Sequence, residues 1–127
     1  MVELDVDYLK SAAEQGDVEA QFLLGYAYAL GNGVPQNARE AVRWWRKAAE
    51  NGHGGAQYNI GIAYFRGMNV PQDYAEAYFW LNLSASQNPS YVEDRDAVAA
   101  NLSPGKIEEV QVRCKKWLED SAQKNCW

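Results

Sequence analysis

The chain has few of the residues that build metal, redox or membrane sites. Its 127 residues include two cysteines and one histidine, too few ligands to assemble a zinc or haem site. No window holds the about eighteen uninterrupted apolar residues of a membrane span, and the first seven residues carry no basic or apolar leader. We therefore expect no metal, no cofactor and no membrane insertion. We expect a cytoplasmic location by default, or a periplasmic or secreted one if a signal peptide has been removed.

Basic residues are also scarce, with 12 Lys and Arg against 17 Asp and Glu and a net charge of −5. The whole imbalance lies in residues 1–36, where six acidic residues are accompanied by Lys10 alone. Nucleic acid requires a concentrated basic surface, so we do not expect it as a partner. The acidic end is typical either of a solvated cap or of a docking surface for a basic partner.

The two cysteines, Cys114 and Cys126, lie twelve residues apart. In one continuous helix they would be separated by roughly 18 Å, which is beyond the reach of a disulfide. Cys114 follows Ile107 and Val110 at helical spacing, so we predict that it is a small core residue. We predict that Cys126 is a free thiol near the chain end.

A repeat dominates the rest of the sequence. Hydrophobic residues make up 47% and charged residues 23% of the chain, which is typical of one globular domain at this length. When residues 20–49 are aligned with residues 56–85, thirteen of the thirty positions are identical. Periods of about 20 to 50 residues indicate stacked supersecondary units.

Each repeat reads as a pair of antiparallel helices, here called A and B. The identical residues in the first half of the repeat share one helical face, and Gly25 and Gly61 recur within it, which predicts a close approach by the paired helix. A turn follows, in which Asn69 replaces Gly33 at a position that favours positive φ. Helix B then starts with N-cap residues followed at the third helical position by Glu, a capping-box pattern: Asn37 with Glu40, and Asp73 with Glu76.

The segments on either side of the repeats complete a solenoid. Residues 8–16 match the B helix that lies 36 residues later, so the chain opens with a lone capping helix. After residue 88 the period fails; we expect a helix over 91–102 and a longer one opened by Ser103-Pro104. The sequence therefore predicts an all-α fold of about seven helices in one domain, with a capping helix over 1–17, repeats over 18–52 and 53–88, and a helical cap over 89–127.

The pattern Ala56-Gln57, Gly61, Tyr64, Gly67, Val70, Asp73, Ala77, Trp80 and Ala85 resembles the Sel-one-like repeat, a longer relative of the tetratricopeptide repeat. The resemblance covers roughly residues 5–88. It implies a right-handed α-solenoid whose A helices line a concave surface that binds a peptide or helix of another protein. Some secreted members with a cysteine pair in each repeat act on β-lactams, but neither repeat here contains cysteine.

Residues that serve the fold should recur with the period, whereas residues that serve one partner need not. The A-helix positions that differ between repeats are therefore our candidates for partner binding, although apolar groups among them could instead fill the joint between repeats. Asn59 is the sharpest candidate, because related repeats often carry Asn there to bind a peptide backbone. The candidate set is Phe22, Leu23, Tyr26, Leu30, Tyr58, Asn59, Ile62 and Arg66.

Other functional interpretations are weaker. The tryptophans Trp44, Trp45 and Trp80 have the spacing of core residues rather than of an aromatic cage. His53 has no Ser or Cys nucleophile beside it in any motif, so we predict no catalytic residues and no enzyme. We expect a protein-interaction adaptor that also pairs weakly with a second copy. The alternatives are a cell-wall or β-lactam enzyme, and a dedicated neutraliser or chaperone of a neighbouring effector or toxin.

Overall fold

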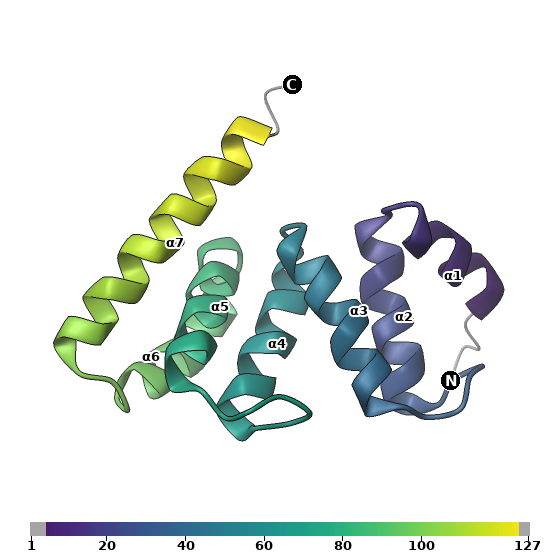
Figure 1. Ribbon diagram of the computed structural model, residues 1–127, viewed down its shortest axis with the longest axis horizontal. Coiled ribbons are helices and arrows are strands. Elements are labelled where there is room, and N and C mark those ends of the chain that lie inside the picture. Colours follow the sequence, from purple (N-terminus) through teal and green to yellow (C-terminus); the bar gives the residue numbers. More distant parts are fainter. Residues whose placement is uncertain (1–4, 125–127) are drawn as a thin grey trace.

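The computed structural model describes residues 5–124 of the chain (Figure 1). This part contains seven α-helices, one short 3-10 helix and no strand, which confirms the all-helical prediction. None of the described helices is long and apolar enough to cross a membrane. The helices are α1 (Val6–Glu14), α2 (Val18–Leu30), α3 (Ala38–Glu50), α4 (Gly54–Arg66), α5 (Tyr74–Gln87), η1 (Pro89–Tyr91), α6 (Val92–Ala99) and α7 (Pro104–Lys124).

The helices form a row in which each packs mainly on its neighbours in the chain (Figure 1). The pairs α2–α3 and α4–α5 are the two repeats, with α2 and α4 as A helices and α3 and α5 as B helices. Helix α1 packs on α2 in the way that α3 packs on α4, and both α6 and α7 pack on α5. This sequential stacking is the solenoid that the repeat predicts.

The predicted N-caps of the B helices are present, but half of the capping box is not. Asn37 accepts a hydrogen bond from the backbone N–H of Glu40 at 3.2 Å. Its own backbone N–H donates to the carbonyl of Tyr28 at 2.8 Å rather than to Glu40, because the preceding turn brings the end of α2 within reach. The prediction that the Glu40 side chain accepts from the backbone N–H of Asn37 is therefore wrong. The corresponding bonds of the second repeat are Glu76 N–H to Asp73 at 3.1 Å and Asp73 N–H to Tyr64 at 3.0 Å.

Glycine recurs where the paired helix comes closest. A Cβ atom added to Gly25 would lie 2.4 Å from the indole ring of Trp45, and one added to Gly61 would lie 2.7 Å from Cγ of Leu81. The predicted close approach is confirmed, and the approaching groups are side chains of the B helix. In the turn between the helices, Gly33 and Asn69 have φ of 82° and 60°, which confirms the predicted positive φ.

A buried glutamine ties three helices together in each repeat. The Gln57 side chain is fully buried; its Nε2 donates to the carbonyl of Ala49 at 3.2 Å, and its Oε1 accepts from Gln87 at 2.9 Å. The amide thus joins the ends of α3 and α5 to the start of α4. Gln21 does the same between α1, α2 and α3 through Ala13 and Asn51.

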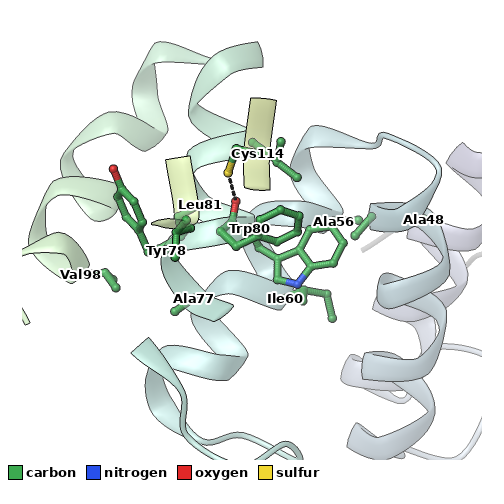
Figure 2. Packing of buried hydrophobic residues seen from close by; sticks show 13 residues of the cluster. Ala48, Ala56, Ile60, Ala77, Tyr78, Trp80, Leu81, Val98 and Cys114 are labelled. Carbon is green, nitrogen blue, oxygen red and sulfur yellow. Dashed lines mark hydrogen bonds between the residues drawn. The ribbon is translucent and has the colours of Figure 1, made fainter. Parts of the chain in front are cut away.

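The main hydrophobic core lies around α5 (Figure 2). Trp80 is buried there with its indole nitrogen on the side of Ile60 (Figure 2), and Trp44 is buried in a second cluster between α1, α2 and α3. Trp45 is half-buried and donates from Nε1 to the carbonyl of Phe22 at 3.2 Å. The prediction that these tryptophans are structural is confirmed.

The C-terminal cap differs in detail from its prediction. The helix expected over 91–102 is replaced by the 3-10 helix η1 and by α6, which ends at Ala99. Asn88 caps η1 by accepting from the N–H of Ser90 at 3.0 Å, and Pro89 then sets the tighter turn. Ser103 caps α7 as predicted, since its hydroxyl accepts from the N–H of Lys106 at 3.2 Å.

Cys114 is buried, as predicted, and its Sγ lies 3.5 Å from the carbonyl of Phe79 (Figure 2). Burial raises the pKa of this thiol from its ordinary value of 9.0. The prediction for Cys126 lies outside the described residues.

This raised pKa predicts a loss of stability at alkaline pH. The unfolded chain releases the thiol proton more readily than the folded one. The stabilisation is therefore complete below the unfolded pKa and is lost as pH rises through the folded pKa. Urea unfolding between pH 7 and 10 should show a falling midpoint, and the fall should be shallower for Cys114→Ala. Equal slopes for the two proteins would contradict the prediction.

Candidate partner-binding surface on the A helices

Burial separates the two kinds of A-helix residue. Most positions that match between the repeats are buried: Ala20, Gln21, Leu24, Gly25 and Ala27 in α2, and Ala56, Gln57, Ile60, Gly61 and Ala63 in α4. The matching Tyr28 and Tyr64 are half-buried. The eight candidate positions are half-buried or exposed. The period therefore separates most of the buried residues from the surface residues on these two helices.

Aromatic rings connect the two A helices. Phe22 stacks on the imidazole of His53 with ring centroids 4.1 Å apart, and meets the edge of Tyr26 at 4.9 Å. Tyr26 in turn packs against Trp45 of α3 at 5.1 Å. Phe22 and Tyr26 thus form part of the joint between the repeats, and they keep a partly exposed surface.

His53 holds this joint in place through two polar contacts in addition to its stacking on Phe22. Its Nδ1 accepts from the N–H of Ala56 at 3.1 Å and so caps α4. Its Nε2 lies 2.8 Å from a carboxylate oxygen of Glu19 on α2. Because Nδ1 accepts a hydrogen bond, we assign the proton of the neutral ring to Nε2, which donates to Glu19. This use is structural rather than catalytic.

Asn59 lies beside Tyr26 across the joint. Its Nδ2 donates to the Tyr26 hydroxyl at 3.3 Å. One N–H and the carbonyl oxygen of the amide have no other hydrogen bond within the described part of the chain. A donor and an acceptor side by side can pair with the backbone of an extended or helical segment, so the amide remains suited to the role that we predict for it.

Tyr58 extends the surface toward the C-terminal cap. It stacks on Tyr91 with centroids 4.4 Å apart. Burial raises the pKa of the Tyr58 hydroxyl, and the nearby carboxylate of Asp94 raises that pKa further. The Tyr58 hydroxyl at this end of the surface is therefore neutral over the physiological pH range.

The other candidates lie toward the edges. Ile62 packs against the main core, whereas Leu23 packs against the cluster formed with α1. Leu30 is 61% exposed at the end of α2, and Arg66 is exposed at the end of α4. The structure thus brings Phe22, Tyr26 and Asn59 into direct contact and leaves Leu30 and Arg66 as separate exposed groups.

Sequence reasoning missed Tyr91 and Asp94 as parts of this surface. Both belong to the region after residue 88, where the period fails. The position 36 residues before Tyr91 is Gly55, so the repeat offered no signal. The contact arises only because η1 and α6 fold back toward α4.

Comparison with known families decides what kind of solenoid this is. The Sel1 repeat family matches three consecutive segments of the chain, residues 6–17, 18–53 and 55–89. The chain belongs to the Sel1 repeat family. The three segments contain α1, the pair α2–α3 and all but the first residue of the pair α4–α5. The resemblance inferred from the repeated residues is therefore confirmed.

Solved structures with the Sel1 repeat, or SLR, fold resemble this chain. One is a protective antigen present in uropathogenic Escherichia coli strains, with a TM-score of 0.83, 30% identity and coverage of 94% of this chain and 26% of the antigen. Another is a Sel1 repeat protein from Oxalobacter formigenes, with a TM-score of 0.73, 30% identity and coverage of 94% and 49%. This chain spans about a quarter and about half of their lengths. Comparison with curated proteins finds no match.

Proposed function

We propose that this Sel1 repeat protein is a non-enzymatic adaptor that binds a peptide or helix of another protein across α2 and α4. The observation that supports the proposal is the separation described above: most A-helix positions that match between the repeats are buried, while the eight variable candidate positions are half-buried or exposed. Sel1 repeat solenoids generally serve as protein-interaction scaffolds. Evolution can alter such surface positions without disturbing the stack.

The chemistry of the surface favours an amphipathic partner. Tyr26 and Tyr58 offer large rigid rings with polar tips, which are frequent at the energetic centres of interfaces. Asn59 supplies one amide for a main-chain contact, but Leu23 occupies the equivalent place in the first repeat. A row of amides is therefore absent at these two positions, and binding should depend on apolar anchors more than on backbone hydrogen bonds.

Paired substitution of Tyr26 and Asn59 tests this proposal. Tyr26→Ser with Asn59→Ala should reduce capture of the native partner by about tenfold or more, because centrally placed anchors dominate binding energy. Capture from a lysate of the source organism, quantified by mass spectrometry, measures the change. The matched control is Tyr8→Ser with Asn101→Ala, which alters a tyrosine and an asparagine that are both exposed away from α2 and α4.

Circular dichroism must show equal helical content for all the proteins. If the Tyr26→Ser, Asn59→Ala variant unfolds, the variant Leu30→Asp with Arg66→Glu is used in its place. It changes two exposed residues at the edge of the same surface. Undiminished capture by folded variants would exclude the A-helix surface.

A further inference from the structure

A second surface lies between the B helices and α7, away from the candidate residues of α2 and α4. A cavity of about 440 Å³ opens between the end of α3 and the second half of α7. A neighbouring cavity of about 340 Å³ shares Glu50, Trp117 and Asp120 with it. Together they form a groove along α7, here called the α7 groove.

The two side-chain amides that line the larger cavity have already used their N–H donors. Nε2 of Gln87 has two N–H groups, and both are used, by the carbonyl of Gly52 at 3.0 Å and by Gln57 at 2.9 Å. Nδ2 of Asn51 likewise donates to the carbonyl of Lys47 at 3.0 Å and to Gln21 at 3.4 Å. An occupant that supplies hydrogen-bond donors can pair with the carboxylates of this cavity, whose other polar side chains include Trp117 and Ser121.

The charges of the larger cavity are of one sign. Glu50 and Asp120 are its charged lining residues, and neither is in an ion pair within the described residues. The C-terminal end of α3 lies at the same place, and its carbonyls add partial negative charge.

Three cations line the smaller cavity, but within the described residues none forms an ion pair with Glu50 or Asp120. Arg46 donates to the hydroxyl of Tyr64, and Arg113 pairs with Glu76. Lys116 lines the smaller cavity one helical turn before Asp120. A pair between them at this exposed site would be weak.

Trp117 gives the groove an aromatic wall. The side chain is half-buried and lines both cavities. An indole face attracts a guanidinium or ammonium group through its quadrupole, and Leu118 beside it offers apolar surface for an aliphatic stem. We propose that the α7 groove docks a basic segment of a protein partner, with an arginine or lysine side chain placed between Glu50, Asp120 and Trp117. The proposal is independent of binding on the A helices.

Titration with blocked amino acids tests the site. The probe is N-acetyl-arginine amide, and its matched control is N-acetyl-citrulline amide, which has nearly the same shape but no charge. The readout is the indole N–H signal of Trp117 in a ¹⁵N-labelled protein, assigned with a Trp117→Phe variant. We expect the arginine derivative to shift this signal in a saturable way and the citrulline derivative to leave it unchanged.

Isosteric substitutions then test whether the carboxylates of Glu50 and Asp120 bind the arginine derivative. Glu50→Gln with Asp120→Asn should weaken binding of the arginine derivative about tenfold. The control Glu108→Gln with Glu119→Gln changes the net charge equally at exposed positions of α7 outside both cavities, and it should leave binding unchanged. Equal binding of citrulline, or an equal loss in both double variants, would overturn the proposal.

Discussion

Replacing Gln57 with leucine is expected to lower the free energy of unfolding by about 2 kcal/mol. Leucine fills a similar volume but offers no hydrogen bond. The carbonyl of Ala49 keeps the backbone N–H of Gly52 as a partner at 3.0 Å, but it loses the bond that Gln57 supplies at 3.2 Å. The bond between Gln57 and Gln87 is lost as well. Each buried hydrogen bond contributes about 0.5–1.5 kcal/mol.

Gln72→Leu is the matched control for this change. Gln72 makes the same kind of bond, from its Nε2 to the carbonyl of Phe65 at 2.8 Å, but its side chain is exposed. Water can replace the lost donor there, so the expected loss is under about 1 kcal/mol. Urea unfolding followed at 222 nm measures both values. Similar losses for the two variants would show that burial does not give Gln57 its importance.

Gly25→Ala is expected to destabilise the protein by about 2 kcal/mol. A methyl group at this position meets the indole of Trp45 at 2.4 Å, and overpacking of this kind costs about 1–3 kcal/mol. Displacing the ring also weakens its hydrogen bond to the carbonyl of Phe22, worth about 1 kcal/mol. The better helix propensity of alanine returns about 1 kcal/mol.

A double-mutant cycle separates crowding from any other effect of the glycine. In a Trp45→Ala background the obstacle is absent, so Gly25→Ala should become neutral or stabilising. Thermal and urea unfolding of the four proteins give the coupling energy. If Gly25→Ala costs the same in both backgrounds, the close approach of the two helices is not the reason for the glycine.

Where the chain repeats, the sequence predicted the helix pairs, their crossing and the conformation of the turn, but not every capping bond. The recurrence of Gly25 at Gly61 predicted the helix crossing, and the exchange of Gly33 for Asn69 predicted a positive φ. Both features depend on local backbone geometry that occurs in each of the two repeats. The reciprocal bond of the capping box failed because the backbone N–H of Asn37 found the carbonyl of Tyr28, a contact fixed by the turn rather than by Glu40.

The region after residue 88 shows where such reasoning stops. The contacts that hold α7 on α5 join residues far apart in the chain, such as Arg113 with Glu76 and Cys114 with Phe79. No period relates these pairs, so helical spacing predicted that Cys114 is buried but not which residues surround it. The stacking of Tyr91 on Tyr58 and the α7 groove have the same origin.

The attachment of α7 mainly to α5 allows this helix to tilt as a rigid body. The helix has 21 residues, which makes it roughly 31 Å long, and α5 is its main packing partner. Cys114 lies in the middle of this attachment, and the helix runs ten residues further to Lys124. A tilt of about 10° there moves the far end by roughly 3 Å. Rigid rotation of α7 can thus widen or narrow the α7 groove on the side of Ser121, more than beside Trp117, while both repeats stay unchanged.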